Sequence, residues 1–121
     1  MESNEIEVNG VVYVLKGSVQ EMAETMDGMP YCIVRTYSAG VFAGYLEKRV
    51  GKEGVVRKAR RIWYWDGAAS LSQLAVYGTS KPENCKFPCE VEKVELTEII
   101  EVIECTKKAK ESIKGVDVWV K

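Results

Sequence analysis

Hydrophobic residues in this chain fall in short runs rich in valine, isoleucine and tyrosine, and glycine or polar residues separate the runs. Runs of this kind are typical of strands in an antiparallel sheet. Small and polar residues at Ser38–Gly40 and Gly51–Gly54 interrupt three consecutive runs and predict tight turns between them. The pattern therefore indicates a meander, with strands expected over residues 10–16, 31–37, 41–50 and 55–65.

Three other segments carry helix-start signals, in which a serine or threonine precedes a run of helix-forming residues. Ser18 and Glu21 form a capping-box pattern, and so do Ser70 and Gln73. Thr106 precedes a third, basic run. A glycine stands just after each segment, as is typical of helix ends. We expect short helices over residues 21–26, 71–77 and 107–114.

Residues 90–104 fit two structures. Leu96, Ile99 and Ile103 are spaced like one face of a helix, whereas the density of β-branched residues favours a strand. We predict a strand here, and a loop over residues 79–88, where two prolines stand among polar residues. The fold class that follows is α+β: an antiparallel β-sheet core, built as a meander, with two or three short helices in a single domain over residues 1–121.

The composition agrees with one folded domain and excludes several classes of function. The chain has 121 residues, of which 46% are hydrophobic, so it can bury a core without disulfides or metals. Its formal net charge of -1 argues against a protein that coats nucleic acid. Histidine is absent from the sequence, which excludes Ser-His-Asp and Cys-His nucleophile systems and histidine metal sites. We therefore expect a protein that is not an enzyme.

The cysteines and the first residues indicate a cytoplasmic protein. Only Cys85 and Cys89 are close in sequence, with Pro88 between them, and this spacing is poor for a zinc site. The N-terminal residues lack the basic and apolar regions of a signal peptide, and no apolar run approaches a membrane span. We expect packed, reduced thiols in the cytoplasm, with no bound metal and no cofactor.

Charge is distributed in blocks. Residues 48–61 carry a net charge of +6, whereas residues 1–27 and 90–104 each carry -5. One interpretation is that the basic block binds an anionic ligand locally. The other is that the charges are solvated and pair across strands.

The segment from Val55 to Gly67 is the first candidate for a ligand site, because it combines arginines with tryptophans. Guanidinium groups bind phosphates, and aromatic rings stack on bases. On a regular strand, Arg57 and Arg61 share a face with Trp63 and Trp65, while Arg60 lies on the other face. The alternative is that the tryptophans belong to the core and the arginines are ordinary surface charges.

Two further segments carry weaker signals. The small-residue turn at Tyr37–Val41 would bring backbone N–H groups close to a ligand, although tight hairpin corners use the same residues. The loop Lys81–Pro88 holds an amide at Asn84, two lysines and Phe87, and could close over a base and ribose. An ordinary loop with Phe87 packed beneath it explains the same residues.

Three stretches of the chain resemble a family of small bacteriophage proteins: residues 33–44 (IVRTYSAGVFAG), 59–75 (ARRIWYWDGAASLSQLA) and 85–89 (CKFPC). The chain is similar to the first-described family of Thoeris anti-defence "sponges". The resemblance implies a viral protein that sequesters a cyclic ADP-ribose isomer, made by a TIR-domain enzyme as an immune signal, without cleaving it. It also implies possible capture of cyclic di- or trinucleotides and a homo-oligomer, either a dimer or an assembly of dimers.

A cyclic ADP-ribose isomer presents an adenine, a pyrophosphate and ribose hydroxyl groups. Aromatic side chains would stack on the adenine, arginines would hold the phosphates, and hydroxyl, carboxylate or amide groups would bind the ribose or the base edge. The candidate ligand-binding residues are Tyr37, Ser38, Arg57, Arg60, Arg61, Trp63, Trp65, Asp66, Asn84 and Phe87.

Two alternatives stay open at this point. A small β-rich module that binds RNA or single-stranded DNA would use the same basic and aromatic residues, and its oligonucleotide binding would depend steeply on salt. A hydrolase would return cleaved nucleotide rather than the intact signal.

Overall fold

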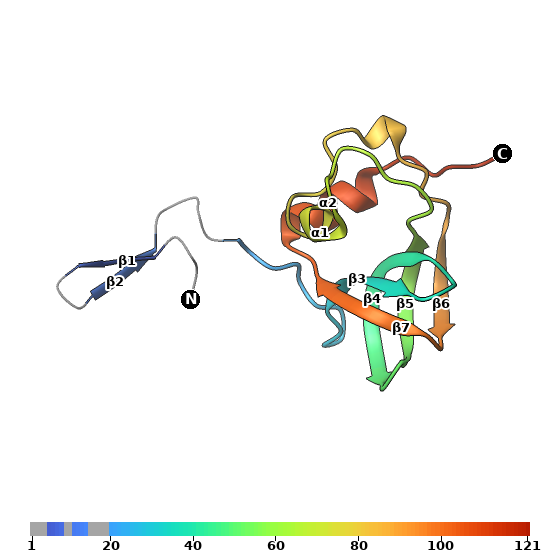
Figure 1. The fold of residues 1–121 in the computed structure, drawn as a ribbon, viewed down its shortest axis with the longest axis horizontal. Helices are drawn as coiled ribbons and strands as arrows, with labels where there is room; N and C mark the ends of the chain where they lie inside the picture. Colours follow the sequence, from blue (N-terminus) through green and yellow to red (C-terminus); the bar gives the residue numbers. More distant parts are fainter. Residues whose placement is uncertain (1–4, 9–10, 15–19) are drawn as a thin grey trace.

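The computed structural model describes residues 5–8, 11–14 and 20–121 and is drawn in Figure 1. Its centre is a five-stranded antiparallel sheet in the order β6-β5-β4-β3-β7. From β3 to β6, strands that are consecutive in the sequence are paired, whereas β7 pairs with β3, so the predicted meander and the α+β class are confirmed. The strands are β3 (Tyr31–Thr36), β4 (Val41–Val50), β5 (Glu53–Arg61), β6 (Glu90–Leu96) and β7 (Ile99–Glu104).

The sheet curls strongly, because a short connection joins the two strands that lie at its opposite edges. Only Thr97 and Glu98 separate the end of β6 from the start of β7, although these strands lie at opposite edges. The prediction of extended structure over 90–104 is thus confirmed, as two strands. Apolar side chains fill the inside of the curl, among them Val34, Phe42 and Val56.

Two helices cover the other face of the sheet (Figure 1). Helix α1 (Leu71–Tyr77) and helix α2 (Lys107–Gly115) agree with the predicted segments. Ser70 accepts a hydrogen bond from the Gln73 amide and Thr106 accepts one from the Ala109 amide, so both predicted N-caps are confirmed. Below the helices lies the larger core cluster, which includes Ile33, Tyr45, Leu74, Phe87 and Ile113.

Gly78 sets the close approach of the two helices. Its φ of +77° favours glycine, and a Cβ atom there would lie 2.3 Å from the Cβ of Ser112 on α2. After Gly78 the chain forms the predicted loop, which contains one turn of 3-10 helix, η1 (Pro82–Asn84). Among the described helices, none has the length and apolar character needed to cross a bilayer.

Near the N-terminus, β1 (Glu5–Val8) pairs with β2 (Val11–Val14) in a separate two-stranded antiparallel sheet. The strand predicted over residues 10–16 is confirmed for residues 11–14. The preceding turn residues 9–10, residues 15–16 and the capping residue Ser18 lie outside the described residues.

The helix predicted over residues 21–26 is wrong. These residues are extended and pair with the start of α2: the Lys107 amide donates to the Glu21 carbonyl at 2.8 Å, and the Ala23 amide donates to the Cys105 carbonyl at 3.1 Å. A tight turn at Asp27–Gly28 then brings Met26 to Met29. Hydrogen bonds to residues about 80 positions later therefore outweigh the local helix preference of this segment.

The strand predicted over residues 55–65 is also corrected. Strand β5 begins at Glu53 and ends at Arg61, so Trp63 and Trp65 lie beyond it. Within β5, Lys58 has a φ of +49°, and the pairing register with β4 shifts at this point. This β-bulge adds one residue to β5, which reverses the alternation of faces for every residue that follows it.

Candidate functional site

The bulge at Lys58 redistributes the three candidate arginines. Arg57 lies opposite Tyr45 and Arg60 lies opposite Ala43, so both point to the helix-covered face of the sheet. Arg61 lies opposite Phe42, on the inner face of the curl. The predicted grouping, with Arg57 and Arg61 on one face and Arg60 on the other, is therefore wrong.

Arg60 is a buried structural residue. Only 5% of its surface is exposed, and its guanidinium donates four hydrogen bonds to backbone carbonyls. Burial lowers the pKa of Arg60 from its ordinary value. Because most of the guanidinium N–H groups are engaged inside the protein, Arg60 does not supply the exposed phosphate contact predicted for it.

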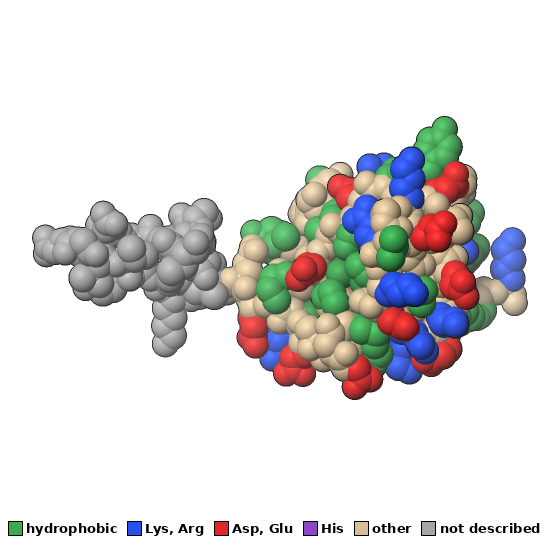
Figure 2. Space-filling view, turned by 90° about the horizontal axis from the view of Figure 1, so that it is seen from below, with side chains coloured by type: hydrophobic (Ala, Val, Ile, Leu, Met, Phe, Trp, Pro, Cys, Tyr) green, Lys and Arg blue, Asp and Glu red, His purple; other side chains and the backbone are tan. Residues whose placement is uncertain are grey.

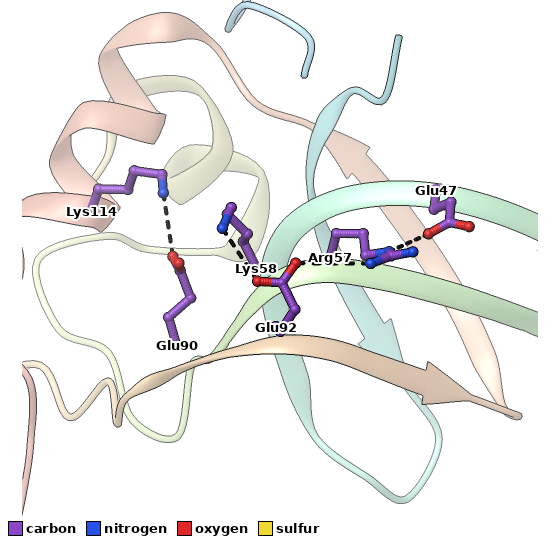
Figure 3. Close-up of polar contacts among 6 residues, drawn as sticks. All are labelled: Glu47, Arg57, Lys58, Glu90, Glu92 and Lys114. Atoms are coloured by element: carbon purple, nitrogen blue, oxygen red, sulfur yellow. Dashed lines mark hydrogen bonds and ion pairs between the residues drawn. The ribbon is translucent and has the colours of Figure 1, made fainter. Parts of the chain in front are cut away.

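Arg57 belongs to a row of alternating charges that we call the ion-pair row: Glu47, Arg57, Glu92 and Lys58 (Figure 3). Arg57 donates to the Glu47 carboxylate and lies 3.8 Å from Glu92, which lies 3.3 Å from Lys58. The hydrogen bond from Arg57 lowers the pKa of Glu47. The hollow beside the row, about 520 Å³, also contains Asp27, so carboxylates outnumber cations in its lining and disfavour a phosphate.

Part of the basic block pairs with the acidic block 90–104 in this way. Arg57 and Lys58 of β5 pair with Glu92 of β6, and beside the row Lys114 on α2 lies 3.3 Å from Glu90. Figure 2 shows basic and acidic side chains intermixed over the visible face, where side chains are coloured by type. The interpretation in which charges pair across strands is therefore confirmed for this surface.

The turn between β3 and β4 brings Arg61 next to the segment of Tyr37 and Ser38, which the sequence analysis had treated as a separate candidate. Arg61 donates to the Ala39 carbonyl and covers the Phe42 ring at 4.4 Å. Ser38 donates to Glu98, whereas the Tyr37 side chain is 79% exposed. The amides of residues 36, 37 and 39 already donate within the protein, which leaves little of the backbone cradle expected for a ligand.

The other three aromatic candidates differ in burial. Phe87 is fully buried beneath the helices and offers no ring face to a base. Trp65 is partly buried and packs against the same core cluster. Trp63, by contrast, is 58% exposed. The two tryptophans that the sequence treated together therefore differ: Trp65 packs against the core, and Trp63 lies at the surface.

Trp63 stacks on Trp119 from the C-terminal segment, with ring centroids 5.2 Å apart and an interplanar angle of 25°. The Lys86 ammonium lies 5.6 Å from the centroids of both Trp63 and Trp119 and 5.9 Å from that of Tyr64. One cation thus contacts three aromatic rings at cation–π distance. We call these four residues the Trp63 platform.

Backbone hydrogen bonds join the three segments that form the Trp63 platform. The Lys86 amide donates to the Tyr64 carbonyl at 2.8 Å, and the Trp63 amide donates to the Lys86 carbonyl at 3.2 Å. The Trp119 amide donates to the Phe87 carbonyl at 3.0 Å. The platform is therefore built on paired main chain rather than on side-chain contacts alone.

Asp66 and Asn84 extend the same two segments. The Asn84 side-chain amide donates to the Asp66 carboxylate at 2.9 Å, and this bond, with a second from the Gly67 amide, lowers the pKa of Asp66. Asp66 stands two residues after Tyr64, and Asn84 stands two residues before Lys86. Two candidate polar residues are thus hydrogen-bonded to each other, in the segments that also carry Tyr64 and Lys86.

The candidate list from the sequence left out three platform residues: Lys86, although its loop was a candidate segment, Tyr64 and Trp119. A regular strand would place Tyr64 on the opposite face from Trp63, but β5 ends before either residue. Trp119 lies 56 residues from Trp63 in the sequence, and no local pattern connects them. The available signal was the short apolar segment 116–120, which contains the third tryptophan of the chain.

Three of the four cysteines are packed thiols, as expected. Cys32, Cys85 and Cys105 are buried and Cys89 is exposed; all four are free. Burial raises the pKa of Cys32 and that of Cys105 to about 12, so these two thiols stay protonated and unreactive at neutral pH.

A protein-family model described as "Domain of unknown function (DUF6948)" matches residues 29–113. The chain belongs to the DUF6948 family. No curated protein and no solved structure matches it. The DUF6948 region includes three platform residues, Trp63, Tyr64 and Lys86, whereas Trp119 follows the end of the match.

Proposed function

We propose that this DUF6948 chain binds and sequesters a nucleotide immune signal, a cyclic ADP-ribose isomer, without cleaving it. It would act in the cytoplasm of a phage-infected cell as an inhibitor of a TIR-domain defence system. The observation that carries the proposal is the Trp63 platform, where an exposed indole, stacked on a second indole, adjoins a lysine ammonium. The resemblance of three sequence segments to the Thoeris sponges agrees with it.

The chemistry of the platform suits the parts of such a ligand. An adenine ring stacked on the exposed surface of Trp63 contributes about 1 to 3 kcal/mol. Lys86 supplies a positive charge for the pyrophosphate, and its three aromatic neighbours hold the ammonium close to the stacking surface. Asn84 and Asp66 offer hydrogen bonds to ribose hydroxyl groups or to the base edge.

A homo-oligomer is part of the proposal. Ligand sites usually bury about 70 to 90% of a small ligand, whereas the Trp63 platform is an open surface on which Trp63, Tyr64 and Val118 remain about half exposed. A second copy of the chain could cover this surface and enclose the nucleotide. Sedimentation velocity, with and without ligand, tests this: a monomer in both conditions contradicts the oligomer.

The decisive experiment is ligand recovery. The purified protein is mixed with a panel of cyclic ADP-ribose isomers and cyclic di- and trinucleotides, free ligand is removed, and the protein is denatured by heat. Mass spectrometry then identifies what is released. Recovery of an intact cyclic ADP-ribose isomer supports sequestration; recovery of cleaved product would make the protein a hydrolase; recovery of nothing contradicts the proposal.

A pair of variants tests whether the platform is the site. Trp63→Ala and Lys86→Ala should each weaken binding about tenfold or more, because each removes a direct contact. A matched control is the other exposed cation–π pair, in which Lys108 lies 5.5 Å from the Tyr77 ring. Tyr77→Ala and Lys108→Ala should leave affinity unchanged in isothermal titration calorimetry. Equal losses of affinity at both pairs would mean that the nucleotide does not bind at the Trp63 platform.

A nucleic-acid module is the second candidate, because exposed rings beside a cation also bind single strands. The mixed charges of Figure 2 and the ion-pair row disfavour it. Binding of RNA or single-stranded DNA with a steep dependence on salt, together with no retention of cyclic nucleotides, would favour this candidate over sequestration.

A further inference from the structure

Arg60 is the most deeply buried charged side chain in the described part of the chain, and all of its hydrogen-bond acceptors are backbone carbonyls. Its Nη1 donates to Ile113 at 2.9 Å, and its Nη2 donates to Val116 at 2.7 Å. On the other side, Nη2 donates to Phe87 and Nε to Pro88, both at 3.0 Å. One guanidinium therefore joins the end of α2 to the loop that precedes β6.

The two segments that Arg60 joins carry two residues of the Trp63 platform, Lys86 and Trp119. The Phe87 carbonyl accepts from both Arg60 Nη2 and the Trp119 amide, each at 3.0 Å. Phe87 and Val118 form a short parallel bridge at the same place. Phe87 follows Lys86 directly, and Val116 stands three residues before Trp119. Arg60 therefore fixes the main chain on both sides of the ring stack.

We infer that Arg60 is the positioning residue of the nucleotide site: it holds the C-terminal segment so that Trp119 stacks on Trp63 before the ligand arrives. This inference rests on the proposed function and adds a residue that does not touch the ligand. A ring stack assembled in advance spares the binding reaction the cost of ordering the C-terminal segment. The loss of Arg60 then weakens binding through Trp119.

The fork of the guanidinium is essential to this role. Arginine presents five donors in a fixed plane, whereas lysine presents three donors on a single nitrogen. A lysine side chain at this position would keep the positive charge but could not span carbonyls of two separate segments at four sites. Arg60→Lys therefore changes the hydrogen-bond geometry at this position while it preserves the positive charge. The matched control is Arg35→Lys, because Arg35 lies on β3 and forms an exposed ion pair with Glu101.

The first readout is the near-ultraviolet circular dichroism of the stacked indoles. The contribution of the stack is the part of the near-ultraviolet signal that Trp119→Ala removes from the wild-type protein. Arg60→Lys should lack this contribution at temperatures where its far-ultraviolet dichroism still shows a folded sheet. Arg35→Lys should retain it. A folded Arg60→Lys protein with the complete tryptophan signal overturns the inference, since the stack would then form without Arg60.

The second readout is affinity for the nucleotide that the recovery experiment identifies. Arg60→Lys should weaken binding about tenfold, and Arg35→Lys should leave it unchanged. In a Trp119→Ala background the further effect of Arg60→Lys should disappear, because the residue acts through Trp119. If Arg60→Lys weakens binding as much in the Trp119→Ala background as in the wild-type protein, the inference is contradicted. A general destabilisation of the fold would weaken binding in both backgrounds.

Hydrogen exchange of the wild-type protein keeps the inference testable if Arg60→Lys does not fold. The Trp119 amide should exchange about a hundredfold more slowly than the amides of residues 120 and 121. If the Trp119 amide exchanges as fast as the amides of residues 120 and 121, the inference is overturned. If the wild-type protein retains no nucleotide, the proposed function fails separately, and the dichroism and exchange results still decide the role of Arg60.

Discussion

Two surface regions of the molecule hold basic side chains in opposite ways. In the ion-pair row, Arg57 and Lys58 are neutralised by Glu47 and Glu92, which come from neighbouring strands (Figure 3). In the Trp63 platform, the neighbours of the Lys86 ammonium are three aromatic rings. An anionic ligand would have to displace carboxylates at the first region, whereas at the second it meets an available positive charge beside an apolar stacking surface.

This difference shows that the density of basic residues in a sequence is a poor guide to an anion site. The segment 48–61 is the most basic in the chain, yet the structure pairs Arg57 and Lys58 with Glu92 of β6 and buries Arg60. Lys86 stands outside that segment, in a loop of mixed composition. The surroundings of a cation, rather than the number of cations, decide what it can bind.

The largest effect should come from removing the buried Phe87 ring, which follows Lys86 of the Trp63 platform in the sequence. Phe87→Ala leaves a cavity in a fully buried position and should lower the free energy of unfolding by about 3 to 5 kcal/mol. Trp63→Ala removes a ring that is mostly exposed and should cost much less. Urea denaturation of both variants measures this; a larger loss for Trp63→Ala would mean that Trp63 is a core residue.

An intermediate effect should separate stacking from charge at the Trp63 platform. Lys86→Met keeps an apolar chain among the rings but removes the ammonium, so affinity for a pyrophosphate-containing nucleotide should fall about fivefold to tenfold. Affinity for adenosine, which has no phosphate, should stay the same. Calorimetry with both ligands checks this. The equivalent change in the ion-pair row, Lys58→Met, should affect neither affinity; a loss there would remove the distinction between the two regions.

The smallest effect concerns acid titration of the ion-pair row. Because the hydrogen bond from Arg57 lowers the folded-state pKa of Glu47, this carboxylate stabilises the fold at pH values above its unfolded pKa. That contribution is lost as pH falls through the lowered folded pKa. In Arg57→Met, the Glu47 pKa should rise towards its ordinary value in a carboxyl NMR titration. An unchanged Glu47 titration would show that the pair does not persist in solution.

Local signals predicted the helices that local contacts stabilise. Ser70 and Thr106 cap α1 and α2 as their sequence patterns indicate, because each hydroxyl bonds an amide three residues away. The pattern at Ser18 and Glu21 is equally typical, yet residues 21–23 pair with residues 105–107 instead. A capping pattern therefore reports what a segment can form, and distant hydrogen bonds decide whether it does.

The candidate site depended on two features that no local pattern contains. The bulge at Lys58 places a non-glycine residue at positive φ, and this moved Arg60 into the interior. The stack of Trp119 on Trp63 joins segments that only the folded chain brings together. The sequence nevertheless singled out the two segments that carry Trp63 and Lys86, and the structure brings these segments together.

The curled sheet also has a consequence for the time course of folding. Strand β3 lies between β4, which follows it directly, and β7, whose residue Glu104 pairs with Cys32 more than 70 positions away. One edge of β3 therefore stays open until nearly the whole chain is available. Pairings between such distant residues are slow to form, typically over milliseconds to seconds. During synthesis the hairpin of β3 and β4 would emerge early with this edge uncovered, and β7 would close it later.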